Sequence, residues 1–192
     1  MKPMTTTRMS LAIVAALLLG GGMATAIEPS DEEVEVLSIM TSAPSKQRID
    51  RAMGSEAVQR LIEIATDTSQ DAGLRLRSYR ALGEYAQSVD ADLARATLVT
   101  AVTALGGTTS GTDLLFLRAS MLSLAQYGST TAQNLVGLLD NPSRDIRAAC
   151  AQALEITGSS TAIQPLRDRA LIETELQVRL AIDDALFELD SN

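Results

Sequence analysis

Four segments of this chain share one helical pattern, and each begins with an aliphatic residue followed by arginine. Apolar or small side chains recur three, six, seven and ten residues after most of these arginines. That spacing places them on one face of a helix with about 3.6 residues per turn. The segments read LRLRSYRALGEYA, LRASMLSLAQYGS, IRAACAQALEITG and VRLAIDDALFELD, and their arginines are Arg75, Arg118, Arg147 and Arg179.

A second stretch with helical apolar spacing precedes each of these segments. The four stretches begin at residues that can cap exposed amides, Ser55, Asp92, Thr130 and Thr161. A single hairpin of two such helices cannot bury its apolar face, so neighbouring hairpins must stack. The pattern therefore predicts an all-α fold, an α-solenoid of about four helical hairpins, with units at residues 55–90, 91–128, 129–158 and 159–192.

The third unit, LLDNPSRDIRAACAQAL, and the RSYRALGEY of the first resemble the HEAT-repeat family, especially its short phycobilisome-lyase HEAT-like repeats. The resemblance covers roughly residues 55–190 and implies a right-handed solenoid whose second helices line the concave face. It also implies a structural ladder, in which each repeated arginine meets acids of its own and neighbouring turns. A ligand-binding row of arginines is the alternative. The acids that precede the four arginines are Asp71, Asp113, Asp145 and Glu175.

The first 26 residues have the order of a secretory signal peptide. A basic stretch, MKPMTTTRMS, is followed by the apolar run LAIVAALLL and the small residues GGGMATA. The apolar run is shorter than the about 20 residues of a membrane span, although an uncleaved anchor is the alternative. We expect cleavage after Ala26, no stable membrane insertion afterwards, and a periplasmic or secreted location. The preference for arginine over lysine is typical of a GC-rich bacterial genome.

Residues 27–54 are less regular than the repeats. DEEVEVLSIM can form an amphipathic helix that caps the first repeat, and TSAPSKQRID predicts a turn into a second short helix. The alternative is a flexible acidic tail that runs to about Glu35.

Composition excludes several classes of function. The chain of 192 residues has a formal charge of −8 and no histidine. A nucleic-acid binder needs a basic surface to replace phosphate counterions, so nucleic acid is not an expected partner. Without histidine, imidazole metal ligands and the Ser-His and Cys-His nucleophile pairs are impossible. We therefore expect no cofactor, no metal site and no enzymatic activity.

Two turns contain fragments of ligand-binding motifs. LGGTTSGTD has the glycine spacing of a phosphate-binding loop, but it lacks the lysine and follows a predicted helix. DTSQDAG begins like a calcium loop, yet Ala72 and Ser78 occupy the positions of the required glycine and glutamate. Both stretches are interpreted as turns between helices.

The surface of the second helices is the candidate binding site. Positions five and nine residues after each arginine point away from the predicted core and combine charged, polar and apolar side chains. A groove with such a mixture is suited to a protein or peptide partner; coverage of helix edges is the alternative role for the apolar members. The candidate partner-binding residues are Arg80, Tyr127, Gln152, Ile156, Asp184 and Phe187.

These features favour a non-enzymatic, exported scaffold or adaptor. One alternative is an enzyme or enzyme subunit of the HEAT-like lyase type. Another is a cell-envelope structural protein that stacks end to end, against which the polar C-terminal sequence ELDSN predicts a closed terminus.

Cys150 is the single cysteine of the chain, so it cannot form an intramolecular disulfide. In the repeat it shares its position with Ser78, Met121 and Ile182, on the face predicted to be buried. Thiolate chemistry requires a lowered pKa, and no histidine is present to activate the thiol. We expect an inert, buried side chain.

Overall fold

A computed structural model describes residues 27–38, 44–109 and 111–191. Within these ranges the chain forms helices and turns and contains no β-strand, which confirms the predicted all-α class. The predicted signal peptide, residues 1–26, lies outside the described residues, as does Ser110 in the turn LGGTTSGTD.

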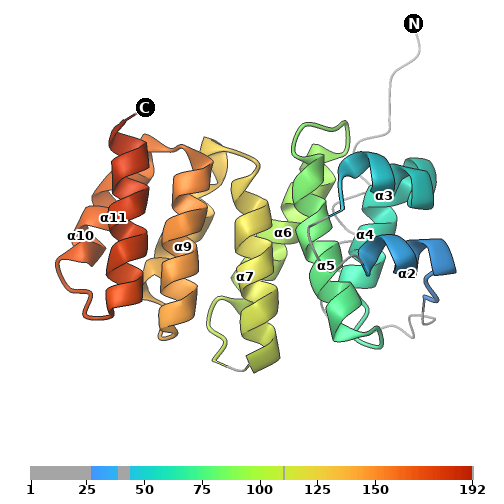
Figure 1. Ribbon diagram of the computed structural model, residues 1–192, viewed down its shortest axis with the longest axis horizontal. Coiled ribbons are helices and arrows are strands. Elements are labelled where there is room, and N and C mark those ends of the chain that lie inside the picture. Colours follow the sequence, from blue (N-terminus) through green and yellow to red (C-terminus); the bar gives the residue numbers. More distant parts are fainter. Residues whose placement is uncertain (1–26, 39–43, 110, 192) are drawn as a thin grey trace, which may run out of the picture.

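The helices that follow residue 56 form consecutive pairs, which stack into a helical solenoid (Figure 1). Their second members lie side by side, and each packs directly on the next. In the third pair, the short first helix continues as a 3₁₀ turn at Val136–Asp140. The pairs are α4 (Ala57–Thr66) with α5 (Ala72–Leu82), α6 (Ala91–Leu105) with α7 (Gly111–Ala125), α8 (Ala132–Leu135) with α9 (Arg144–Thr157), and α10 (Ile163–Ala170) with α11 (Leu176–Asp190).

Local signals fix where these helices begin and end. The side chain of Asp71 accepts hydrogen bonds from the backbone N–H groups of Gly73 and Leu74, which caps the start of α5. At the other end of a second helix, Gly158 terminates α9 with a φ of 62°, a left-handed conformation that favours glycine. The stretch DTSQDAG thus joins α4 to α5, which agrees with its interpretation as a turn between helices.

The helix face predicted from the repeat is buried between the stacked pairs. Small residues allow the second helices to approach closely. A Cβ atom at Gly83 would lie 3.2 Å from the Cα of Ser123 on α7, and Ala148, Ala149 and Ala151 of α9 are all buried. The core residues six and seven positions after the arginines include Ala81, Leu82, Leu124, Ala125, Ala153, Leu154 and Ala185.

Two short helices cover the N-terminal end of the stack. These are α2 (Asp31–Leu37) and α3 (Lys46–Met53), in the segment for which the sequence leaves a helical cap and an acidic tail open. Ser30 and Glu33 form a capping box at the start of α2. Leu37 and Ile49 are fully buried, so both helices contribute apolar side chains to the core.

Polar contacts tie the same segment to the first repeat. The Glu33 carboxylate accepts hydrogen bonds of 2.8 and 2.9 Å from Arg60 of α4, and this hydrogen bonding lowers the pKa of Glu33. Further upstream, the backbone N–H of Ile27 donates to Asp67 over 3.3 Å, and the Gln70 side chain donates to the Ile27 carbonyl. The first described residue of the chain is therefore held against the turn between α4 and α5.

Candidate functional site

The candidate surface is the face of the stack formed by α5, α7, α9 and α11, called here the second-helix face. Figure 1 shows these four helices in front, with α6 and α10 behind them. Arg80, Gln152 and Asp184, predicted to point away from the core, are exposed on α5, α9 and α11. The row therefore runs from a cation at the first repeat to a carboxylate at the last.

A hollow of about 390 Å³ lies between α9 and α11 on this face. It brings together two of the sequence-predicted residues, Gln152 and Asp184. The rest of its lining is mainly apolar, and the complete lining is Gln152, Leu176, Gln177, Leu180, Ala181 and Asp184. An open hollow with apolar walls and a few polar groups fits side chains of a partner.

Ile156 and Phe187, also predicted as contact residues, are exposed near the C-terminal end of the stack. Ile156 is 43% exposed and Phe187 is 72% exposed. Beside Ile156, burial and the nearby carboxylates of Glu188 and Asp184 raise the pKa of Glu155. The apolar side chains of this region therefore lie in a negative electrostatic environment.

Tyr127 differs from its predicted role. Its hydroxyl group donates a 2.6 Å hydrogen bond to the carbonyl of Leu82, and burial raises its pKa. The side chain is only partly accessible, because the close approach of α5 and α7 places it over the end of α5. The Tyr127 side chain links the second repeat to the first, and only part of it is exposed to solvent.

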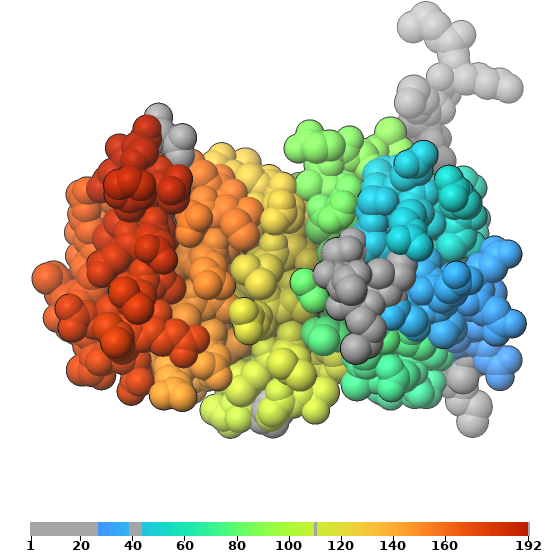
Figure 2. Space-filling view, viewed as in Figure 1, coloured from blue at the N-terminus to red at the C-terminus, as the bar shows by residue number. Residues whose placement is uncertain are grey.

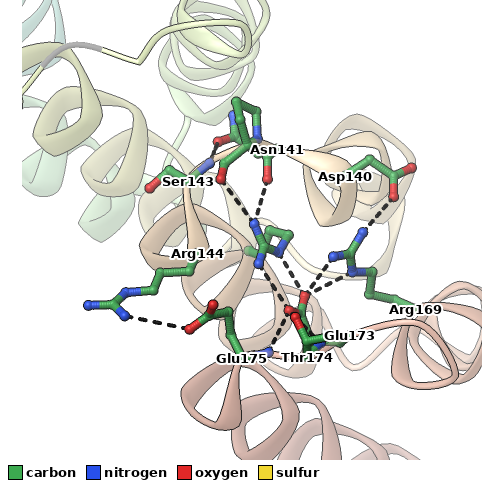
Figure 3. A network of polar contacts seen from close by, with 10 residues as sticks. Asp140, Asn141, Ser143, Arg144, Arg169, Glu173, Thr174 and Glu175 are labelled. Carbon is green, nitrogen blue, oxygen red and sulfur yellow. Dashed lines mark hydrogen bonds and ion pairs between the residues drawn. The ribbon is translucent and has the colours of Figure 1, made fainter.

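Of the four repeated arginines, Arg147 makes the most extensive contacts. They belong to a polar network whose labelled members in Figure 3 include Asn141, Arg169 and Glu173. Its guanidinium forms a bidentate pair with the buried carboxylate of Glu173, at 2.7 and 3.0 Å. It also donates to the carbonyls of Asn141 and Pro142 at 3.0 and 3.1 Å. The planar guanidinium suits this arrangement, because one side chain satisfies acceptors from two successive turns.

Glu173 is in turn shared by several donors. Arg169 donates to Oε2 at 2.7 Å, and the backbone N–H groups of Thr174 and Glu175 donate to Oε1 at 3.1 and 3.0 Å. These hydrogen bonds, above all those from Arg147, hold the pKa of Glu173 far below its usual range. Glu173 thus links α9 of the third repeat to the start of α11 in the fourth.

The other repeated arginines do not extend this arrangement into the ladder that the resemblance implies. Arg75 donates to the carbonyl of Ala65 at 3.2 Å, and its guanidinium lies 4.6 Å from the centre of the Phe116 ring. Arg118 and Arg179 are exposed. Asp71 caps α5 instead of pairing with Arg75, so the repeated acids and arginines do not form one continuous row.

The acidic partner of Arg147 was not among the acids considered from the sequence. Glu175 and Asp145, which lie closer to their arginines in sequence, instead approach Arg144, at 3.5 and 3.9 Å. Glu173 occupies the position of the fourth repeat that corresponds to Asn141 in the third. Aligning the turns as well as the helices would have placed a buried polar residue at both positions.

Cys150 lies in the core, as its place in the repeat predicts. Its side chain is fully buried, and the thiol lies 3.2 Å from the carbonyl of Leu135. Burial raises the pKa of the thiol, which opposes formation of the reactive thiolate.

The described residues show no cluster of three or more acidic or cysteine side chains arranged to hold a metal ion. Across the same ranges, no helix is both long enough and apolar enough to span a membrane.

Stacked helical hairpins and a mixed polar and apolar second-helix face define a helical-repeat protein. The sequence comparison agrees, since residues 99–186 match the family described as HEAT repeats. The matched part begins within α6 and ends within α11, and the pair α4–α5 continues the same stack before it. No curated protein matches the chain. HEAT repeats are commonly scaffolds for protein interaction.

Proposed function

We propose that this protein is a non-enzymatic, exported scaffold that binds a protein or peptide partner through its second-helix face. The observation that carries the proposal is the hollow between α9 and α11, where Gln152 and Asp184 flank the apolar side chains of Leu176 and Leu180. The similarity to HEAT repeats supports a binding role for this face.

The charge of the hollow defines the kind of partner. Asp184 and Glu188 are exposed beside it, and their carboxylates contribute to the raised pKa of Glu155. A segment with aliphatic side chains for the hollow and lysine or arginine beside them would match both its shape and its sign. The proposed partner is therefore basic and amphipathic.

The non-enzymatic part of the proposal rests on the residue types available. The chain contains no histidine, and its single thiol is buried with a raised pKa. Neither supplies a general base or an activated nucleophile. Binding alone is therefore the simplest activity that these residues support.

Export is proposed from residues 1–26, whose basic, apolar and small-residue stretches are those of a signal peptide. Amino-terminal sequencing of the protein recovered outside the cytoplasm should begin at Ile27. Protein that is found only in the cytoplasm, with residues 1–26 retained, contradicts this part of the proposal.

Partner binding is tested by site-specific photocrosslinking in the native host. A photoreactive residue at Gln152 should give a discrete crosslinked product, because this position lines the hollow. The same residue at Asn134, exposed on the first helix α8, is the matched control and should not give that product. Asp184→Arg should abolish the product from position 152 by reversing the charge beside it. A product that forms equally from both positions, or that survives Asp184→Arg unchanged, refutes the assignment of this face.

A further inference from the structure

The solvent-exposed side of α11, at the C-terminal end of the stack, carries an apolar stripe that shares Leu176 and Leu180 with the hollow between α9 and α11. Leu176, Leu180, Asp183 and Phe187 follow one another at intervals of four, three and four residues, which places them on one side of the helix. The three apolar members are 68, 54 and 72% exposed. Figure 2 shows this last helix at the surface, at the opposite end of the molecule from α2 and α3. The polar sequence ELDSN, which predicts a closed terminus, lies at the end of this helix, whereas the exposed apolar side chains are spread along it.

The same side of the preceding second helix is covered in its middle. When Arg179 is aligned with Arg147, Leu180 corresponds to Ala148 and Asp183 to Ala151. Both alanines are buried, and α9 packs directly on α11. The counterparts of Leu176 and Phe187 on α9 are Arg144, which is exposed, and Glu155, which is half-buried. Leu180 and Asp183, in the middle of the stripe, therefore border the side of α11 on which a following repeat would pack.

Another repeat of the same kind does not fit there. Small residues on α9 admit a close neighbouring helix, whereas α11 has the larger Leu180 and the charged Asp183 at these positions. The N-terminal end of a second molecule is also unsuitable, because it exposes charged side chains of both signs, Glu32 and Glu35 on α2 with Arg48 and Arg51 beside them on α3. Covering these charges with the apolar stripe would remove them from water without compensation. Head-to-tail stacking is thus opposed by both size and charge.

We propose that this face pairs with the same face of a second copy of the chain, with the two α11 helices antiparallel about a two-fold axis. The stripe is suited to such a pairing because its members are symmetrically spaced. Leu176 and Phe187 lie equally far from the midpoint between residues 181 and 182, as do Leu180 and Asp183. Antiparallel pairing about this midpoint sets Leu176 of one copy against Phe187 of the other, an isologous contact.

The charges beside the stripe also match in this arrangement. Arg179 is exposed, whereas the equivalent Arg147 binds a carboxylate, Glu173, from the following repeat. In the antiparallel pair, Arg179 of each copy lies beside Asp183 of the other. The second copy then supplies the carboxylate that a following repeat would supply, and the two-fold axis forms this ion pair twice.

The expected dimer is weak. A contact of one helix against one helix is smaller than the about 800 Å² per partner of a standard interface. Sedimentation equilibrium of the purified exported protein through the micromolar range should show the average mass rising from one copy towards two. A mass of one copy throughout this range overturns the proposal, and so does a mass that grows beyond two copies.

The first variant is Phe187→Glu, since Phe187 belongs to the stripe and does not line the hollow between α9 and α11. It should remain at one copy while circular dichroism shows unchanged helix content. The matched control is Leu115→Glu on α7, where Leu115 is 54% exposed, and it should dimerise like the wild type. Equal dimerisation of Phe187→Glu and the wild type refutes the pairing.

Charge exchange tests the antiparallel register. Arg179→Asp and Asp183→Arg should each weaken the dimer about tenfold by placing like charges together, and the chain with both substitutions should recover wild-type association. Failure of the double variant to recover, when both single variants are folded and weakened, rejects the two-fold arrangement.

Discussion

The two ends of the solenoid differ in whether their apolar side chains are buried or exposed. At the N-terminal end, α2 and α3 fold over the first repeat and bury Leu37 and Ile49. At the C-terminal end, nothing in the described chain follows α11, and Phe187 remains exposed. A stack of repeats needs a covered or polar surface at each end. Within the described residues, this cover is present at the first repeat and not at α11, called here the open end. The open end carries the hollow and the apolar stripe that we propose for binding, and these two surfaces share Leu176 and Leu180.

The largest expected effect concerns the buried ion pair beside the open end. Glu173→Ala leaves the Arg147 guanidinium buried without its carboxylate and should lower the free energy of unfolding by about 3–5 kcal/mol. Urea denaturation measures this loss. Asp190→Ala is the matched control, because its exposed pair with Arg167 is worth at most about 1 kcal/mol. Similar losses in the two variants would mean that burial of the first pair does not matter.

The same pair sets a pH dependence. The pKa of Glu173 is lower in the folded protein than in the unfolded chain, so its stabilising contribution is present above the unfolded pKa of about 4.3. The contribution is lost as the pH falls below that value, because the unfolded chain then binds a proton that the folded protein resists. Glu173→Ala should therefore flatten the acid side of the curve of stability against pH.

The next effect compares the ends directly. Leu37→Ala removes a fully buried side chain from the N-terminal cap and should cost about 2–5 kcal/mol of unfolding free energy. Phe187→Ala removes an exposed side chain and should change it by less than about 0.5 kcal/mol. Both values come from denaturant unfolding below the concentration at which the protein dimerises. A large loss for Phe187→Ala in the monomer would show that α11 is covered by its own chain.

A smaller effect is expected between the two ends, where α9 has neighbours on both sides. Cys150→Ala should cost about 1 kcal/mol, because alanine is nearly as large as cysteine and the lost contacts are few. In the native protein, a thiol reagent should label Cys150 slowly, at the rate of unfolding. Rapid labelling without denaturant would contradict its burial.

The smallest effect lies at the covered end. Hydrogen bonds from Ser69, and also from the backbone N–H of Ile27, lower the pKa of Asp67 to about 2. If cleavage after Ala26 converts that N–H group to an α-ammonium group, its contact with Asp67 becomes an ion pair. In a chain that starts at Ile27, Asp67→Asn should then cost about 0.5 kcal/mol. Thermal unfolding of the variant and the wild type, each with and without an acetylated Ile27, measures how much of this stability loss depends on the terminal charge. An equal loss with and without acetylation would exclude the ion pair.

The helix pairs and their buried face are predictable from the sequence because they depend on local periodicity. Cys150 is the clearest case, since three other repeats mark its position as buried. Glu173 is different, because its importance comes from Arg147, 26 residues earlier in the chain. The partial burial of Tyr127 likewise depends on how closely α5 and α7 approach, which no single helix pattern specifies.

The exposed stripe on α11 is not predictable from the C-terminal sequence for a similar reason. The polar residues of ELDSN lie at the tip of the chain, whereas the apolar stripe is spread along α11 at helical intervals. A terminal sequence describes the last turn of a helix and does not describe its outer side. Comparing α11 with α9 position by position, in place of reading its end, would have shown that Leu180 stands where a buried alanine is expected.

The polar turns also bear on how the repeats unfold. Asn141 donates to the carbonyl of Gly106 at 2.8 Å, and Arg147 joins the Asn141 carbonyl to Glu173. These bonds connect the turns of three successive repeats. Opening the last hairpin breaks the bond to Arg147 and exposes a buried charge, so the third and fourth repeats should open as one cooperative unit. Amide hydrogens of α9 and α11 would then exchange with solvent at a common rate, slower than those of α2.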